Sequence, residues 1–388
     1  MQRRNFLKTA LGGTVALAAA NLPNLVSASA KNAPVAKASP DSSDSQPRPP
    51  ALRGVNLGGW LVLEKWMLGD NSEVFRGTSA PDEYTLCKIL GDKAAARLNR
   101  HRETFITAED FRWIKQHGLN AIRLPVGYWA LEAPKPYVEC ARFIDFAMEQ
   151  AQANGLTVLL DLHGAPGSQN GWMHSGREGA ANWHKDPKNI AQTLRVLEAF
   201  AQKYGRHPAL FGIELLNEPR GNLPLETLKQ FYQDAYARLR PLLDADKAVV
   251  FHDSFRPLLW KRFMQPPAYQ NVILDLHSYQ CFGDDEKKRT AREQLETALQ
   301  RAELLKEMQR DELPVIVGEW SLALPPRATE GLTPLQADSV KRAYGALQLL
   351  NYEDTRGWFY WSYKLLKDSV WDLRNCVNRG WLPENFAP

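Results

Sequence analysis

Residues 119–127 read LNAIRLPVG and residues 156–164 read LTVLLDLHG, and the segment between them, 140–154, has the apolar spacing of an amphipathic helix. Near-continuous apolar runs joined by a helix are typical of parallel strands that are buried on both faces. The same alternation continues along the chain. Further apolar runs occupy residues 52–60, 210–219, 247–254, 271–279, 313–320 and 357–364.

Helical patterns separate these runs. The first opens at Thr107, has Glu109 and Asp110 in its first turn and closes at Gly118, which are the signals of a helix capped at both ends. The others lie at residues 188–205, 225–243, 286–310 and 336–350. Eight strands alternating with helices predict an α/β fold, a closed (β/α)8 TIM barrel that forms one domain over residues 53–388. A doubly wound open sheet is the alternative, but no G-x-G-x-x-G or phosphate-binding loop accompanies any run.

The composition excludes several classes of protein. Of the 388 residues, 44% are hydrophobic and 24% charged, which is globular rather than disordered, collagen-like or coiled-coil. The net charge is +4, and residues 1–30 supply +3 of it through Arg3, Arg4 and Lys8 without an acid, which leaves +1 for the rest. A nearly neutral body argues against a nucleic-acid partner. No uncharged apolar run approaches the roughly 18 to 20 residues of a membrane span, so an integral membrane protein is not expected.

The first thirty residues have the pattern of an export signal. A basic start precedes the uncharged stretch Thr9–Ala30, which ends in small residues. The pair Arg3-Arg4 resembles the twin-arginine signal, with a Sec signal or a retained anchor as alternatives. The pattern predicts a bacterial protein that is exported to the periplasm or secreted. Residues 31–52, rich in Pro, Ser and Ala, are expected to form a flexible linker.

No metal or other cofactor is expected. The histidines form no H-E-x-x-H motif, and the pairs Asp161-x-His163 and Asp275-x-His277 lack a clear third ligand. We expect these two histidines to donate hydrogen bonds to the substrate or to catalytic carboxylates. The alternative is that each is a structural histidine whose hydrogen bonds are made within the core. The four cysteines are far apart and match no zinc spacing, so free thiols are expected at Cys87, Cys140, Cys281 and Cys376.

Polar side chains gather where the apolar runs end. In a (β/α)8 barrel the carboxyl ends of the strands form the face that holds the active site. Two carboxylates stand out there, Glu218 and Glu319. Pro219 favours an extended Glu218, and Gly318 leaves room beside Glu319. The other polar or aromatic residues at the strand ends are Arg123, His163, Asn217, His277, Ser278, Tyr279, Trp320 and Trp361.

Two carboxylates across a pocket can hydrolyse a glycosidic bond. One donates a proton to the leaving oxygen, and the other attacks the anomeric carbon or activates water. A structural ion pair is the alternative for either residue. A Ser/His/Asp hydrolase is disfavoured because G-x-S-x-G is absent. Tryptophans can offer flat faces to sugars, although most tryptophans belong to the core; those near strand ends or loops are Trp60, Trp66, Trp129, Trp172, Trp183, Trp320 and Trp361.

Seven segments, in order, resemble glycoside hydrolase family 5 and within it the fungal exo-β-1,3-glucanases. They span the chain from residue 53 to about 372 and lie at the predicted strand ends. The segments are RGVNLGGWLVLE (53–64), NAIRLPVGYWAL (120–131), DLHGAPGSQNG (161–171), GIELLNEP (212–219), LHSYQCF (276–282), VGEWSLAL (317–324) and GWFYWSYK (357–364).

The resemblance implies a (β/α)8 catalytic domain, a retaining mechanism and a role for each matching residue. Glu218 becomes the general acid/base and Glu319 the nucleophile, with Arg123 and Tyr279 as hydrogen-bond donors to Glu319. Asn217 is expected to hold the 2-hydroxyl of the sugar. The remaining substrate contacts are expected from His163, His277 and Glu64 (other hydroxyls), Trp361 (the floor of the subsite), and Trp172 with Phe282 (an aromatic clamp at the entrance).

The resemblance weakens in two places, the loop Met173–His184 and the segment LLKDSVWDLRNCVNRGWLP (365–383). By the same resemblance, these loops are expected to line the subsites that determine the linkage cleaved and the choice between exo and endo attack. The expected activity is exo-cleavage of β-1,3-glucan by a monomer. An endo-β-1,4-glucanase or a transglycosylase of the same family is the alternative. From a different class, a non-catalytic carbohydrate-binding barrel is disfavoured because both glutamates are present.

Overall fold

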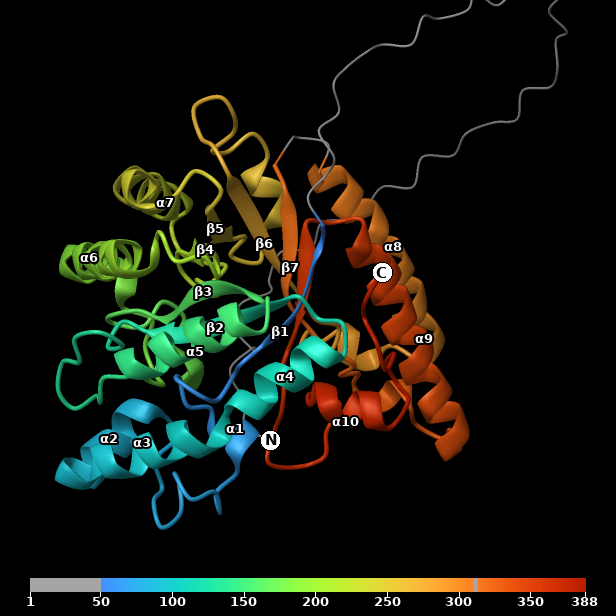
Figure 1. Ribbon diagram of the computed structural model, residues 1–388. Coiled ribbons are helices and arrows are strands. Elements are labelled where there is room, and N and C mark those ends of the chain that lie inside the picture. Colours follow the sequence, from blue (N-terminus) through green and yellow to red (C-terminus); the bar gives the residue numbers. More distant parts are fainter. Residues whose placement is uncertain (1–49, 310–312) are drawn as a thin grey trace, which may run out of the picture. The chain divides into compact units, whose positions relative to one another are not determined.

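Eight parallel strands close into a barrel in chain order, with β1 paired to both β2 and β8 (Figure 1). The computed structural model describes residues 50–309 and 313–388, so the predicted signal and nearly all of the predicted linker lie outside the described residues. The closed barrel confirms the predicted fold class. The strands are β1 (Leu52–Asn56), β2 (Ala121–Gly127), β3 (Thr157–Gly164), β4 (Leu210–Glu214), β5 (Ala248–His252), β6 (Val272–Ser278), β7 (Val315–Trp320) and β8 (Gly357–Tyr360).

Helices surround the barrel, with α6 and α7 on one side and α8 and α9 on the other (Figure 1). Between β5 and β6 there is only a short 3-10 helix, Pro257–Trp260. The α-helices are α1 (Lys65–Leu68), α2 (Glu83–Leu90), α3 (Ala94–Phe105), α4 (Ala108–Gln116), α5 (Ala141–Ala153), α6 (Pro187–Tyr204), α7 (Leu225–Leu239), α8 (Ala291–Gln309), α9 (Pro334–Glu353) and α10 (Leu373–Asn378).

Several boundaries differ from the predicted ones. Helix α7 ends at Leu239 rather than at residue 243, because Pro241 has no backbone N–H to continue the ladder, and a 3-10 turn follows. Helix α8 begins at Ala291, five residues later than predicted. Strand β1 begins at Leu52, which is buried, so the predicted linker extends one residue too far.

The tryptophans divide into core and site residues. The side chains of Trp60, Trp129, Trp183 and Trp320 are fully buried, and Trp60 Nε1 donates to the carbonyl of Arg102 at 2.8 Å. These four belong to the core. Trp361 is buried as well, but its ring lies parallel to that of His163 at the strand ends. Trp66 and Trp172 are partly exposed.

The four cysteines are free thiols, and three of them are buried. Among the described residues, no helix combines the length and the apolar character that crossing a membrane requires.

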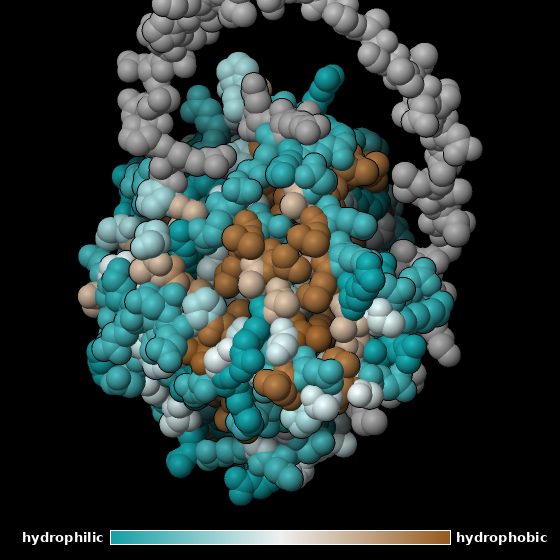
Figure 2. Space-filling view, turned by 90° about the vertical axis from the view of Figure 1, so that its right-hand side faces the viewer, coloured by the Kyte–Doolittle hydropathy of each residue, from teal (hydrophilic) through white to brown (hydrophobic). Residues whose placement is uncertain are grey.

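On the α8–α9 side, Figure 2 shows apolar side chains gathered between hydrophilic ones. These two helices carry three leucines that are more than half exposed, Leu299, Leu335 and Leu350. No candidate site residue lies on either helix, so the apolar face is separate from the strand ends that carry the predicted site.

Candidate active site

Glu218 lies four residues after the end of β4, and its backbone has φ of +44°. The extended conformation predicted for it is therefore wrong. The following Pro219 disfavours only the right-handed helical region, and the left-handed region stays open. Two side chains from the loop after β3 fix this backbone: Gln169 Nε2 donates to the carbonyl of Asn217 at 2.9 Å, and Asn170 Nδ2 donates to that of Glu218 at 3.2 Å.

Glu319 lies near the end of β7 and accepts a hydrogen bond on each carboxylate oxygen. Arg123 Nη1 donates to Oε1 at 3.1 Å, and Tyr279 OH donates to Oε2 at 2.7 Å. The register between β6 and β7 shifts between Leu276 and His277, which places His277 opposite Glu319. Such irregularities re-aim side chains, and they are common beside active sites.

Gly318 makes room for a third carboxylate. A Cβ at this position would collide with the side chain of Asp275, whose Oδ1 accepts a hydrogen bond from Gly318 N at 2.5 Å. Asp275 Oδ2 in turn lies 3.4 Å from His277 Nε2. The space predicted beside Glu319 is thus filled by the residue that orients His277.

Arg123 is the centre of a buried network. Its Nε and Nη2 donate to both oxygens of Glu214 at 2.7 and 3.0 Å, and Nη2 lies 3.1 Å from Asp161 Oδ2. It also donates to Asn217 Oδ1 at 2.8 Å and to Asn56 Oδ1 at 3.0 Å. Burial raises the pKa of Glu214 to about 8 and that of Asp161 to about 7, against the lowering effect of Arg123. The guanidinium is a permanent charge because arginine does not lose its proton.

His277 connects the two candidate carboxylates. Its Nδ1 lies 2.9 Å from Glu218 Oε1 and 3.5 Å from Glu319 Oε2. Since one atom contacts both groups, the two carboxyls face each other across a single pocket. Burial lowers the pKa of His277, but Glu319 and Asp275 outweigh burial and hold that pKa well above its usual value.

The two carboxyls differ in the groups that surround them. Burial acts to raise the pKa of Glu218, but the hydrogen bond and charge of His277 outweigh it, with help from His174 and His252, so this pKa is lowered. Burial raises the pKa of Glu319 to about 8, and the negative charge of Glu218 contributes to that rise. A proton placed on Glu218 removes this charge, and Arg123 can then hold Glu319 ionised. The two carboxyls thus differ in their partners: imidazoles face Glu218, and a guanidinium and a phenol donate to Glu319.

Three of the other predicted residues, Asn217, His163 and Trp361, contact one another in series beside this pair. Asn217 Nδ2 is 3.5 Å from His163 Nε2, and His163 Nδ1 is 2.7 Å from Asp161 Oδ2. The rings of His163 and Trp361 are nearly parallel, with centroids 5.4 Å apart. Glu64 is buried and accepts a hydrogen bond from Trp66 Nε1 at 2.6 Å.

The predicted aromatic residues lie in two groups. Trp172 packs edge-on against Phe255 at 6.1 Å, and Phe255 is 43% exposed. Phe282 stacks on Trp371 at 6.0 Å, and Trp371 also meets Trp66 at 5.5 Å. The prediction paired Trp172 with Phe282, whereas the structure gives each of them a further aromatic partner.

The sequence reasoning missed several residues. Glu214 is an acid within an apolar run, and a search for ionisable residues inside buried strands would have found it. Asp161 and Asp275 were weighed only as metal ligands, although each stands two residues before a histidine, on the same face of its strand. His252 ends β5 and carries the same strand-end signal as His163 and His277, whereas His174 and Phe255 lie in loops and carry no local signal.

Two groups of side chains have ligand atoms within 4.8 Å of one another: Glu218, His252 and His277, and Glu214, Asp275 and His277. Both share His277, whose Nδ1 already contacts Glu218, and Arg123 already neutralises Glu214. These contacts suit proton sharing better than cation binding.

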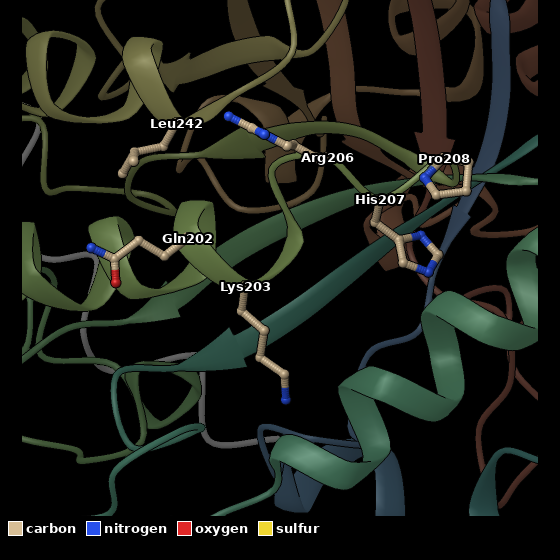
Figure 3. Close-up of a pocket in the computed structure, with 6 residues that line it drawn as sticks. All are labelled: Gln202, Lys203, Arg206, His207, Pro208 and Leu242. Atoms are coloured by element: carbon tan, nitrogen blue, oxygen red, sulfur yellow. The ribbon is translucent and has the colours of Figure 1, made fainter.

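Two hollows lie at different ends of the barrel. The one in Figure 3, of about 540 Å³, is formed by the end of α6, the loop before β4 and Leu242. It lies at the amino end of β4, and side chains there serve stability more often than chemistry. A smaller hollow of about 210 Å³ is lined by Asp253, His277 and Arg301 among others, and therefore borders the candidate site.

Comparison with known proteins adds to this geometry. Residues 92–365 match the family model of Cellulase (glycosyl hydrolase family 5). The chain is 37% identical to a glucan 1,3-beta-glucosidase of Blumeria graminis, over 86% of this chain and 87% of that one. It is 33% identical to glucan 1,3-beta-glucosidase 1 of Schizosaccharomyces pombe, over 87% and 88%.

Among solved structures, the rutinosidase of Aspergillus niger aligns with a TM-score of 0.72 at 22% identity, covering 86% of this chain and 98% of that one. An endoglucanase of Thermotoga maritima aligns with a TM-score of 0.54 at 17% identity, covering 84% and 93%. At these identities the two structures share the fold alone.

Proposed function

The chain belongs to glycosyl hydrolase family 5 and is a glycosidase, and on this premise we propose that it is a retaining enzyme that releases glucose from the ends of β-1,3-glucan. One observation carries the mechanism: Glu319 takes its hydrogen bonds from Arg123 and Tyr279, whereas Glu218 faces imidazoles. Imidazoles exchange protons near neutral pH, and guanidinium does not. These surroundings suit Glu218 to carry the catalytic proton and Glu319 to carry the charge.

In the first step, a carboxylate oxygen of Glu319 attacks the anomeric carbon. The bond from that carbon to the leaving oxygen breaks, and Glu218 transfers its proton to that oxygen. The contact of His277 with both carboxyls supports direct attack, because an inverting enzyme needs room for a water between sugar and base. In the second step, Glu218 takes a proton from water, and the water oxygen displaces Glu319.

The other residues are proposed to hold the sugar. Asn217 is fixed by Arg123 and suits a contact to the 2-hydroxyl, which strengthens in the transition state. His163, His277 and Glu64 are proposed to bind the remaining hydroxyls. The proposed aromatic surfaces are Trp361 beneath the sugar, and Trp172 and Phe282 at the entrance, extended by their neighbours Phe255 and Trp371.

The substrate assignment rests on the relatives. Relatives that match over most of their length include proteins named glucan 1,3-beta-glucosidase, from Blumeria graminis, and glucan 1,3-beta-glucosidase 1, from Schizosaccharomyces pombe. An endo-β-1,4-glucanase is the second candidate, and the Thermotoga maritima endoglucanase favours it only through a shared fold. Transfer to a sugar acceptor is the third, favoured by the exposed aromatic side chain of Phe255 next to Trp172.

The product profile tests this proposal. The purified protein is given β-1,3, β-1,4 and β-1,6 gluco-oligosaccharides in parallel, and the products are followed from the first minutes. We expect glucose alone, and from the β-1,3 oligomers at least about tenfold faster than from the others. A spread of oligomers would indicate an endo-acting enzyme, products longer than the substrate would indicate transfer, and fastest release from β-1,4 oligomers would contradict the linkage.

We also propose that residues 1–30 direct twin-arginine export, that the following residues up to β1 are a linker, and that the barrel acts as a monomer. The support for export is the sequence pattern around Arg3-Arg4. Changing both arginines to lysine in a bacterial host is expected to leave the enzyme in the cytoplasm, as judged by activity in cell fractions. Continued export of that variant would point to a Sec signal. The support for a monomer is that one barrel supplies every proposed catalytic side chain.

A further inference from the structure

We propose that His174 is a positioning residue for Glu218: its Nε2 holds the carboxyl oxygen that donates the catalytic proton until the leaving oxygen of the substrate takes that place. The inference rests on the proposed function and extends it to a residue in the loop Met173–His184, where this chain departs from the fungal pattern.

The position of His174 is well defined. It lies in the short 3-10 helix Met173–Ser175 after β3, and its side chain is buried. The ring lies between those of Trp172, 5.4 Å away, and His163, 5.2 Å away. Ser175 anchors the turn, because its Oγ donates to the carbonyl of Trp172 at 2.7 Å and lies 2.6 Å from Ser168 Oγ.

The two oxygens of Glu218 have different partners. Oε1 lies 2.9 Å from His277 Nδ1, and the far nitrogen of His277 faces Asp275 at 3.4 Å. A carboxylate at that distance favours a protonated Nε2, so His277 can donate to Glu218 while Asp275 holds its other end. Oε1 is then occupied as an acceptor, and the transferable proton of Glu218 belongs on Oε2.

His174 Nε2 lies 3.3 Å from Oε2. This distance is longer than a typical charge-assisted hydrogen bond, so a substrate oxygen can replace the imidazole as the partner of Oε2. Over one catalytic cycle, Oε2 gives its proton to the leaving oxygen and regains one from water. His174 gains and loses no net proton in that cycle.

Other titratable groups face this pair. Glu218 is surrounded by His277 from β6, His252 from β5, and Glu319 across His277. His174 also faces His163, which Asp161 orients. Among these groups, His174 contacts Oε2, and it is one of the influences that lower the pKa of Glu218. Removing it is expected to make Glu218 hold its proton to higher pH.

The test is the pH dependence of kcat/KM for His174→Leu and His174→Gln with two substrates. With a poor leaving group, such as the sugar of a β-1,3 disaccharide, the alkaline limb reports loss of the proton of Glu218 in the free enzyme. We expect the alkaline limb of the kcat/KM profile to shift to higher pH by about one unit in both variants. With dinitrophenyl β-glucoside, whose leaving group needs no proton, the profile is expected to stay within about twofold of the parent at every pH.

His184→Leu is the matched control, since it removes a second histidine of the same loop that takes no part in the proposed chemistry. The acid and alkaline limbs of its pH profile should stay where they are in the parent enzyme. An equal loss on both substrates with the limbs in place would overturn the proposal and leave His174 a structural role. Unchanged profiles for both variants would overturn it as well. Failure of the proposed function is distinguishable, because the parent enzyme itself would then hydrolyse neither substrate.

Discussion

Replacing Glu319 by glutamine is expected to abolish turnover, with a loss of at least about ten-thousandfold in kcat. An amide of the same shape cannot form the glycosyl ester, so the first step stops. The fold should survive because Arg123 can still donate to the amide oxygen, the Tyr279 hydroxyl can accept from the amide nitrogen, and Arg123 keeps Glu214 and Asp161 as counter-charges. The measurement is the rate of release from a β-1,3 oligosaccharide and from dinitrophenyl β-glucoside.

Two controls separate chemistry from folding in this experiment. Circular dichroism and thermal unfolding show whether the Glu319→Gln barrel is intact, and calorimetry shows whether it still binds an oligosaccharide. Glu353→Gln is the matched variant, since it removes a carboxylate that pairs with Arg53 at the partly exposed end of α9. That variant should retain full activity. A fully active Glu319→Gln enzyme would remove Glu319 from the nucleophile role.

Replacing Glu218 by alanine is expected to have the next largest effect, and one that depends on the leaving group. Departure of a sugar needs the proton of Glu218, so oligosaccharide cleavage should fall by about a thousandfold or more. Dinitrophenolate leaves without a proton, so the glucosyl-enzyme should still form. It should then accumulate, because no base remains to activate water. The measurement is a pre-steady-state burst of dinitrophenolate followed by slow turnover.

Added azide distinguishes this mechanism from others. A small anion can enter the space that the Glu218 side chain leaves and attack the glucosyl-enzyme without a general base. The expected product is β-glucosyl azide, with turnover of dinitrophenyl β-glucoside restored by at least about tenfold. The α-azide would indicate inversion, and equal losses on all substrates without rescue would remove Glu218 from the acid/base role.

The barrel could be predicted from the sequence because each buried strand is a local pattern. Runs such as TVLLDLHG form strands wherever both faces are covered, and their polar last residues mark the carboxyl ends. Glu319, His163 and His277 were found in this way. Helices α2 and α3 were missed, because α2 has only eight residues and α3 carries several charged residues that weaken its apolar pattern.

Contacts that cross the barrel could not be predicted from local pattern. The φ of Glu218 depends on Gln169 and Asn170, almost fifty residues earlier in the chain. The contact of His174 with Glu218 likewise spans the loop after β3 and the end of β4. Such contacts depend on how the loops fold over the mouth of the barrel. The conformation of a loop leaves no periodic pattern in a single sequence from which it could be predicted.

The most direct test of the retaining mechanism is trapping of the covalent intermediate with a 2-fluoro-glucoside that carries a dinitrophenyl leaving group. Inactivated protein is digested, and the labelled peptide is sequenced by mass spectrometry. We expect one 2-fluoroglucosyl group per chain, on Glu319 within the segment VIVGEW. A label on another residue with Glu319 unmodified, or hydrolysis of the reagent with inversion and no label, would contradict the mechanism.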